Sequence, residues 1–137
     1  RLRLRPIFDN CAMADALLTY DALVGATPVS ARGARVLAAF RDEYARYREH
    51  AAPYALALRR ALHEPEEIVV VAEHDDAQRF VRAAWKAPSA WRVVRVLDVQ
   101  RDADEIAARG FPTARTPVAF VCRGATCSAP LYDAAAL

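Results

Sequence analysis

The spacing of apolar residues changes at Pro65, and this change limits the possible folds of the 137-residue chain more than any other feature. Before Pro65, apolar residues recur every three or four positions, which is the spacing of an amphipathic helix. After it, short β-branched runs alternate with short amphipathic segments, as in proteins whose strands alternate with helices. The pattern therefore predicts a mixed α/β protein, with a helical segment over 1–64 and a small α/β subdomain over 65–137.

Three amphipathic helices with short links are predicted in the helical segment. Asp9 or Asn10 can cap the first helix. The second is expected to start near residues 27–30 and to run to about residue 50, and Pro53 suits the first turn of the third. One apolar stripe runs along the first helix and contains Met13, Ala16, Leu17, Tyr20, Leu23 and Val24. Consecutive helices with short links form antiparallel hairpins.

Strands are predicted in the α/β subdomain at three β-branched runs, 67–72, 92–99 and 116–122. Helical patterns lie between them, one after Asp75 or Asp76, which can cap it, and one over 102–109. The order strand–helix–strand–helix–strand favours parallel pairing with right-handed crossovers. We therefore expect a small three-stranded, mainly parallel sheet with flanking helices. The last residues, LYDAAAL, would begin another element, so we expect the polypeptide to continue beyond them.

The charge balance argues against nucleic acid and membrane partners. The chain has 19 basic and 17 acidic residues, a formal net charge of +2, so it carries little excess positive charge to attract phosphate-rich surfaces. It contains no apolar run of about 18 residues that would cross a membrane. Three cysteines are an odd number and a low density, unlike the disulfide scaffolds of small secreted proteins. We therefore expect a cytoplasmic protein.

Two cysteines, Cys122 and Cys127, follow the third predicted strand in the sequence CRGATC. Zinc usually requires four ligands, and the chain offers no second pair, so no metal site is expected. A redox centre of the CxxC type places its cysteines at the start of a helix, whereas this pair follows a strand. Gly124 permits a tight turn, so a disulfide is sterically possible and would contribute about 2 kcal/mol. We expect instead two buried, reduced thiols that pack the turn.

Polar residues near the ends of the predicted strands are candidates for a ligand site. The loop from Glu73 to Gln78 follows the first strand, and Asp98 lies near the end of the second. These side chains could bind a metal or act as acid and base, but helix capping by Asp75 or Asp76 also accounts for the loop. The loop contains no glycine, so it cannot form a phosphate-binding loop of the nucleotide-binding kind, and no cofactor is expected.

Carboxylates on the first predicted helix raise the question of glycoside hydrolysis, which uses a pair of carboxylic acids. Asp9, Asp15 and Asp21 are spaced six apart and so do not share one helical face. Each could cap a helix or face solvent, or one of them could work with a carboxylate elsewhere in a larger protein. Trp85 and Trp91 could stack on a sugar or a base, or could pack at the edge of the core.

Three stretches of the chain resemble one protein family, in the order in which that family has them. TPVAFVCRGATCSAPLYDAAAL is similar to a C-terminal family pattern written ptAYVCRNxaCxxPvtdpxxL. PIFDNCAMADALLTYDALVGA resembles a DN…ALLxLxxLTG helix, and EEIVVVAE resembles an eIVIVG strand. The family is that of the large thioredoxin-domain-containing proteins related to spermatogenesis-associated protein 20. The resemblance covers nearly all of the chain.

The resemblance implies a larger protein, in which a thioredoxin-like domain precedes a six-hairpin α/α barrel similar to glycosidases and N-acylglucosamine epimerases. This chain would be a C-terminal fragment, with 1–64 as the last helices of the barrel and 65–137 as a small appendage. The remainder of the same polypeptide is then the implied partner. Asp9 and Asn10 would lie at the barrel cavity, where a sugar-like ligand could bind, and they are the candidate catalytic residues. The motif DNCAMAD lacks the Pro-Ser-Gly-Asn extension of many relatives, which weakens the case for that role.

The preferred interpretation is a fragment with a structural or accessory role and no complete active site. Two alternatives stay open. One is a free-standing α/β module that binds a small ligand through the loops at Glu73–Asp76 and Asp98. The other is part of a carbohydrate-processing enzyme whose cavity includes Asp9. If the helices come from a barrel, their apolar stripes lack their partners in the chain alone, and we expect the chain to self-associate.

Overall fold

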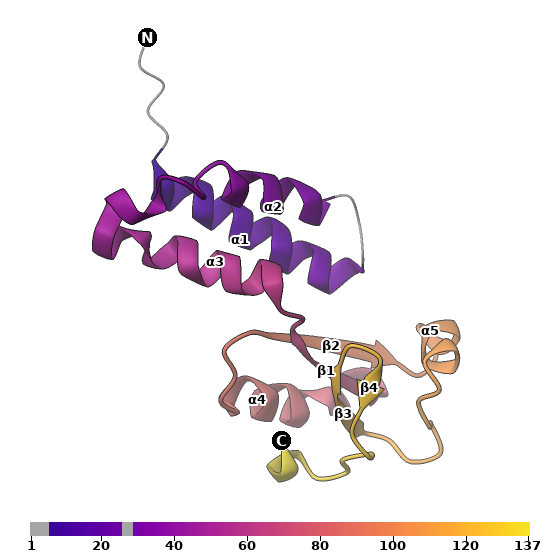
Figure 1. The fold of residues 1–137 in the computed structure, drawn as a ribbon. Coiled ribbons are helices and arrows are strands. Elements are labelled where there is room, and N and C mark those ends of the chain that lie inside the picture. The colour runs from indigo at the N-terminus through magenta and orange to yellow at the C-terminus, as the bar shows by residue number, and fades with distance from the viewer. Residues whose placement is uncertain (1–5, 26–28) are drawn as a thin grey trace. The chain divides into compact units, whose positions relative to one another are not determined.

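The chain forms two compact units in a computed structural model, a helical unit over Arg1–Glu64 and an α/β unit over Pro65–Leu137 (Figure 1). The structure describes residues 6–25 and 29–137, and it leaves out the side chains of residues 29, 30, 74 and 75. The mixed α/β class with a helical N-terminal part, expected from the apolar spacing, is confirmed.

The helical unit contains α1 (Ile7–Val24), α2 (Val29–Ala38) and α3 (Ala52–Leu62), with a 3-10 segment, η1 (Tyr44–Ala51), before α3. α1 packs against both α2 and α3. The buried residues of this core are Ile7, Cys11, Ala14, Leu18, Leu37, Phe40, Tyr54 and Ala57. α1 begins after Pro6, whose ring holds φ at −64°, a value that suits the start of a helix. Asp9 and Asn10 therefore lie inside the first turn, and the expectation that one of them caps the helix is wrong.

The expected long second helix is broken into two segments. α2 ends at Ala38, and Arg48 has a φ of +49° inside η1. Contacts between rings accompany this break: Tyr44 stacks on Tyr54 with ring centroids 5.1 Å apart, and Phe40 meets Tyr47 edge to face at 6.4 Å. Apolar residues keep a helical spacing through the break, so periodicity alone could not locate it.

Gly33 lies at a close contact between α2 and α1. The residue is buried, and a Cβ at this position would lie 3.1 Å from the carbonyl oxygen of Ala14 and 3.2 Å from Cγ of Leu18. Glycine costs a helix about 1 kcal/mol relative to alanine. Here it removes the side chain that would hold the two helices apart.

The α/β unit begins with strand β1 (Glu66–Ala72), and its elements follow one another closely. They are η2 (His74–Ala77), α4 (Gln78–Lys86), β2 (Arg92–Asp98), α5 (Ala103–Ala108), β3 (Val118–Arg123), β4 (Thr126–Cys127) and η3 (Ala134–Ala136). α4 starts from Ala77 after the η2 turn, so the N-cap position is not Asp76 and the expected cap by Asp76 is wrong. The side chain of Asp75, the other expected cap, lies outside the described part of the chain.

The sheet is four-stranded and mixed, with the order β2-β1-β3-β4. β1 and β2 are parallel as expected, but β3 runs antiparallel to β1, and β4 runs antiparallel to β3. A parallel crossover usually contains a helix that returns along the whole sheet. α5 has 6 residues and advances only about 9 Å, which does not return the chain to the start of β2. The chain enters β3 from the end at which β2 finished, so β3 runs antiparallel to β1.

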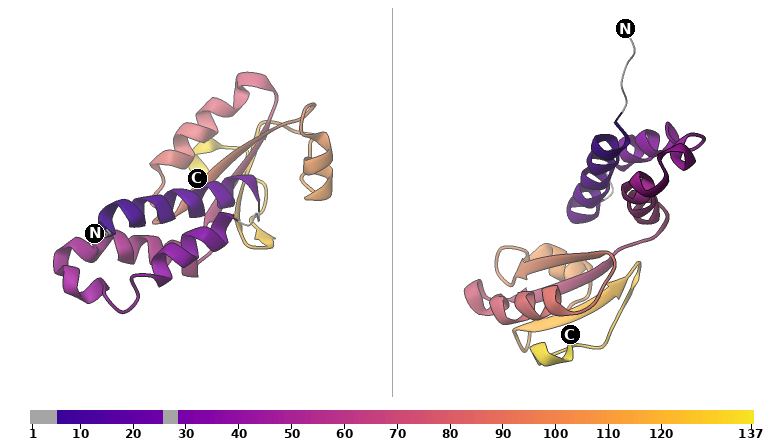
Figure 2. Two further views of the ribbon diagram at one scale, coloured as in Figure 1. Left: turned by 90° about the horizontal axis from the view of Figure 1, so that it is seen from above. Right: turned by 90° about the vertical axis from the view of Figure 1, so that its left-hand side faces the viewer.

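The two faces of the sheet are covered by different elements (Figure 2). Val69 and Val71 lie on the α5 face with Ile106, whereas Ile68 and Val70 lie on the opposite face with Phe80 of α4. This alternation of β1 is the one expected for a strand covered on both sides. These four side chains of β1 are at most 1% exposed, so β1 is the centre of the unit.

Candidate functional site

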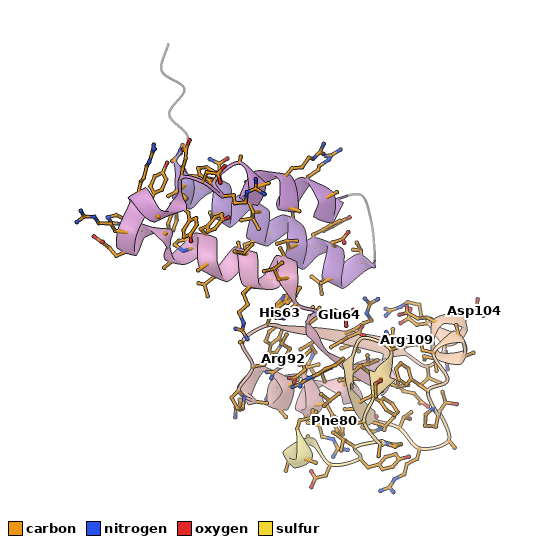
Figure 3. All side chains as sticks on the ribbon, in the orientation of Figure 1. His63, Glu64, Phe80, Arg92, Asp104 and Arg109 are labelled. Atoms are coloured by element: carbon orange, nitrogen blue, oxygen red, sulfur yellow. A yellow bond between two sulfur atoms is a disulfide. The ribbon has the colours of Figure 1, made fainter. Side chains whose placement is uncertain are left out.

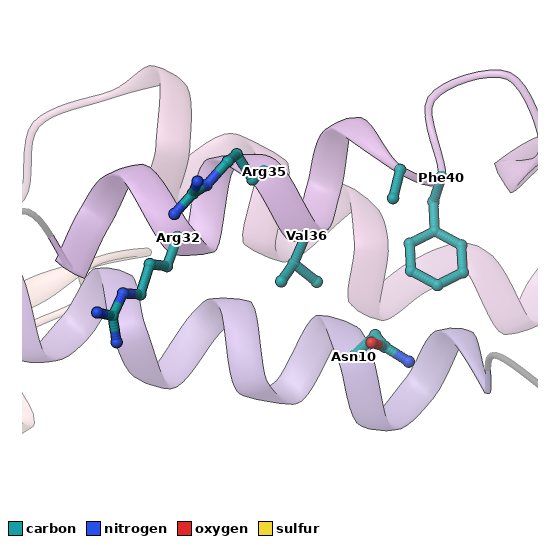
Figure 4. Close-up of a pocket in the computed structure, with 6 residues that line it drawn as sticks. Asn10, Arg32, Arg35, Val36 and Phe40 are labelled. Atoms are coloured by element: carbon teal, nitrogen blue, oxygen red, sulfur yellow. The ribbon is translucent and has the colours of Figure 1, made fainter.

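An open pocket of about 420 Å³ lies in the helical unit between α1 and α2 (Figure 4). Its lining residues are Asn10, Arg32, Arg35, Val36, Ala39 and Phe40. Asn10, a candidate from the sequence, therefore lines a pocket, whereas Asp9 is exposed in the first turn of α1 and is not part of the lining. The volume lies within the range of small-molecule sites, about 300–1,000 Å³.

The chemistry of this pocket suits binding better than catalysis. Asn10 uses its amide nitrogen to donate to the carbonyl oxygen of Pro6 at 2.8 Å. Arg32 and Arg35 stand one turn apart on α2 and are exposed, and Phe40 is buried at the end of the groove. The lining contains two guanidinium groups and no carboxylate. It could hold an anionic or hydroxylated molecule, but it lacks the pair of carboxylic acids that glycoside hydrolysis uses.

The other carboxylates of α1 do not converge on the pocket. Asp15 accepts a hydrogen bond from Nη1 of Arg60 at 2.7 Å, and the same guanidinium reaches Thr19 Oγ1 at 3.0 Å. This contact joins α1 to α3. Asp21 is half-buried further along α1. The three aspartates therefore form no acid–base pair with one another, in agreement with their spacing.

The polar residues at the strand ends make turns. Asp98 accepts backbone hydrogen bonds from Gln100 at 3.0 Å and Arg101 at 2.9 Å, and its own N–H donates to Oδ2 of Asp102 at 2.8 Å. Glu73 and Asp76 are exposed. Among the side chains that the structure describes, which leave out those of residues 74 and 75, no group of three or more histidine, cysteine or acidic side chains is placed to hold a metal ion.

The two tryptophans differ in their surroundings. Trp91 is half-buried just before β2, and its Nε1 is buried with no hydrogen-bond partner among the described residues. Trp85 is 62% exposed at the end of α4. Packing at the core edge therefore describes Trp91, but it is wrong for Trp85.

A charged cluster that sequence reasoning missed surrounds the start of β1. Glu67 accepts hydrogen bonds from Nε of Arg95 on β2 at 3.0 Å and from both terminal nitrogens of Arg109, which follows α5. Glu105 of α5 bonds Arg95 at 3.3 Å and lies 3.6 Å from Arg109. Burial opposes ionisation of Glu67, but Arg109 and Arg95 outweigh it and hold its pKa below the ordinary value. The cluster ties α5 to the sheet.

Glu66 makes a second set of ion pairs on the opposite face. Its carboxylate bonds Arg123 at 2.8 Å and Arg92 at 3.2 Å, and the hydrogen bond from Arg123 is the main reason that its pKa lies below the ordinary value. Arg92 is almost fully buried (Figure 3). It also donates to the carbonyl oxygens of Ala84 and Ala87, groups that the end of α4 leaves without helical partners. The carboxylates of Glu66 and Glu67 are therefore both paired with arginines of the same unit.

Cys122 and Cys127 are joined by a disulfide, so the expectation of two reduced thiols is wrong. The two residues face each other across the β3–β4 hairpin, with Cα atoms 4.0 Å apart. A two-residue turn, Gly124-Ala125, connects the strands, and Gly124 has a φ of +56°. Glycine at the first position of a two-residue loop is the signal for a type II′ hairpin. That signal, present in CRGATC, sets the register that places the two sulfurs together.

The disulfide is strongly asymmetric in its exposure. Cys122 is fully buried on the α5 face, where Glu67 is its neighbour across the strand pair. Cys127 is exposed on the edge strand β4. The third cysteine, Cys11, is buried in the helical unit and free, and burial raises the pKa of its thiol. Only the hairpin thus combines a reactive group with access from solvent among the described cysteines.

Comparisons with known proteins place no constraint on this chain, since no family model, curated protein or solved structure matches it. Among the helices that the structure describes, none has the length and apolar character needed to cross a membrane.

Proposed function

We propose that this chain is an accessory segment of a larger protein and carries no complete active site of its own. In this proposal it is the C-terminal part of a cytoplasmic thioredoxin-domain protein with a glycosidase- or epimerase-like α/α barrel, and its helical unit packs against other helices of the same polypeptide. The observation that carries the proposal is the outer face of α1.

The outer face of α1 is apolar and exposed along most of the helix. Its large exposed side chains are Met13, Tyr20, Leu23 and Val24, between 45% and 57% exposed. The opposite face of the same helix, which includes Cys11 and Leu18, is buried against α2 and α3. A helix that is apolar on both sides is typical of a core helix with neighbours on both sides. The described helices of the unit supply neighbours on one side only.

A further layer of helices fits this face better than a small ligand does. Ala12 and Ala16 lie along the middle of the outer face, between its larger side chains, and both are exposed. Small residues flanked by large ones give the ridges and grooves through which helices pack at 8–10 Å. The outer face also carries few charges, Asp9 in the first turn being the exception. An α/α barrel supplies such helical neighbours on both sides.

The isolated chain should therefore associate or bind a hydrophobic dye through α1. We expect light scattering after size exclusion to show oligomers, or a strong dye signal, and we expect Met13→Glu/Tyr20→Glu to reduce it. Leu56→Glu is the matched control, because Leu56 is 63% exposed on α3, away from this face. Addition of the preceding residues of the natural polypeptide should also suppress the signal. A monodisperse wild-type monomer that binds no dye would contradict the proposal.

A role in carbohydrate processing is the second candidate, because Asn10 lines a pocket of suitable volume. In this form of the proposal the pocket binds a sugar-like ligand, and catalytic carboxylates come from elsewhere in the larger protein. Titration with a sugar acid, followed by NMR, should shift resonances of Asn10 and Arg32, and Asn10→Ala should weaken those shifts. A ligand site at Glu73–Asp76 is less well supported, since neighbouring Asp98 is engaged in a turn.

A further inference from the structure

The Cys122–Cys127 disulfide lies in a hairpin of the α/β unit, and it is unusual for the cytoplasmic setting expected from the sequence. Disulfides in a reducing cytoplasm are mostly transient, catalytic or redox-sensing. The bond closes a hairpin whose turn and register are already defined by Gly124-Ala125 and by backbone bonds. By loop-closure entropy it contributes only about 2 kcal/mol. Stabilisation of the hairpin alone therefore gives little reason for the presence of the disulfide.

We propose that the Cys122–Cys127 pair is a thiol–disulfide exchange site, entered by a small thiol at the sulfur of Cys127. The argument rests on the difference in exposure between the two cysteines, since Cys122 is 0% exposed and Cys127 lies exposed on the edge strand. An attacking thiolate must approach in line with the bond that it breaks, and Cys127 is the residue of the pair that solvent reaches. The chemical class of the partner is a low-molecular-weight thiol, such as a cysteine-containing tripeptide.

The exchange balances in two steps. In the first, the external thiolate forms a bond to Sγ of Cys127, and the Cys122–Cys127 bond breaks with its electron pair on Sγ of Cys122. Burial disfavours a charged sulfur there, so Cys122 takes up a proton. In the second step, another small thiolate attacks the mixed disulfide at the sulfur of the first small thiol, and the bond to Cys127 breaks to release Cys127 as a thiolate. The protein disulfide is reduced to two thiols, and two small thiols are oxidised to one disulfide.

The surrounding hairpin favours reversal of this reaction. Ser128 holds the strands together independently of the sulfurs, since its N–H donates to the carbonyl of Val121 at 2.9 Å and its Oγ accepts from the N–H of Val121 at 3.1 Å. Ala119 and Leu131 form a further antiparallel bridge. Cys122 and Cys127 would therefore stay opposite each other after reduction, and closure of the mixed disulfide would be intramolecular. The site can then cycle without unfolding the sheet.

The test uses the full chain with Cys11→Ala, so that only the hairpin reports. Native protein is held in millimolar reduced glutathione, quenched with acid, alkylated and analysed by peptide mass spectrometry. We expect reduction while tryptophan fluorescence still reports a folded α/β unit. The proposal is overturned if the disulfide persists until the unit unfolds, because it would then be a structural bond only.

Two single-cysteine variants test the predicted direction of attack. With Cys122→Ala, the remaining Cys127 should form a mixed disulfide with oxidised glutathione rapidly. With Cys127→Ala, the remaining Cys122 should react slower by roughly tenfold or more, because reaction requires local opening. Equal rates in the two variants would refute entry through Cys127. The reduction experiment keeps both cysteines of the hairpin, so it remains decisive if either single-cysteine variant folds poorly.

Discussion

Gly33→Val offers a sharp test of the helical unit, because helix propensity and packing predict opposite changes in the free energy of unfolding. Valine is a somewhat better helix former than glycine, so propensity alone predicts a gain of a few tenths of a kcal/mol. Packing predicts a loss, since even the Cβ would lie 3.1 Å from a backbone oxygen of Ala14 and 3.2 Å from Leu18 Cγ. The backbone of α1 cannot rotate away as a flexible side chain could. Overpacking of this kind costs about 1–3 kcal/mol, so we expect a net destabilisation of about 1–2 kcal/mol.

The two units can be followed separately in the full chain. Both tryptophans, Trp85 and Trp91, belong to the α/β unit, whereas α1, α2 and α3 are the longest helices. In urea, Gly33→Val should lower the midpoint measured by circular dichroism at 222 nm and leave the fluorescence midpoint unchanged. Ala34→Val is the matched control, since Ala34 is exposed on the same helix and should lose at most about 0.7 kcal/mol. An unchanged or higher midpoint for Gly33→Val would show that the helices do not cross this closely.

Three further predictions concern the α/β unit and the free cysteine. Val70→Asp places a carboxylate at a position that is 0% exposed, so it should cost several kcal/mol and abolish the fluorescence transition; wild-type-like melting would show that this face of β1 is open to solvent. Glu67→Gln should lose about 1–2 kcal/mol at neutral pH. The folded pKa of Glu67 is lowered, so its contribution is complete above its ordinary value of 4.5 and is lost as pH falls through the folded value. The variant should therefore show a smaller decline of stability in acid, and equal pH profiles would refute the assignment. Cys11, buried with a raised thiol pKa, should be alkylated slowly at neutral pH in native protein and rapidly in urea; rapid native labelling would contradict its burial.

Local patterns were sufficient for features that depend on one element at a time. The alternation of β1, with Val69 and Val71 on one face and Ile68 and Val70 on the other, follows from the strand period of two. For α1, periodicity identified one apolar stripe, which the structure leaves exposed at Met13 and Tyr20. The buried stripe of α1 has an equally helical spacing. Which of the two stripes is buried depends on where α2 and α3 pack, and the sequence of α1 alone does not determine it.

Features that depend on several elements could not be predicted from local patterns. The direction of β3 depends on the path of the whole connection between β2 and β3, and the strand itself carries no mark of its direction. Glu67 meets Arg95 and Arg109, which lie 28 and 42 residues away in sequence. β4 has two residues, too few to show an alternating pattern. The disulfide was missed for a different reason: the turn signal of Gly124 was present, and the assumed reducing compartment outweighed it.

The adjacent carboxylates Glu66 and Glu67 have a consequence for how the chain tolerates insertions. One is bonded to arginines on the α4 face and the other to arginines on the α5 face. Consecutive strand residues point to opposite faces, so one extra residue inserted after Glu67 would either exchange the two carboxylates between unrelated partners or turn the four buried aliphatic side chains around. Residues 63–65 precede both sets of ion pairs. Extra residues should therefore be accommodated in that linker, which makes it the place to lengthen the chain or to insert a reporter domain.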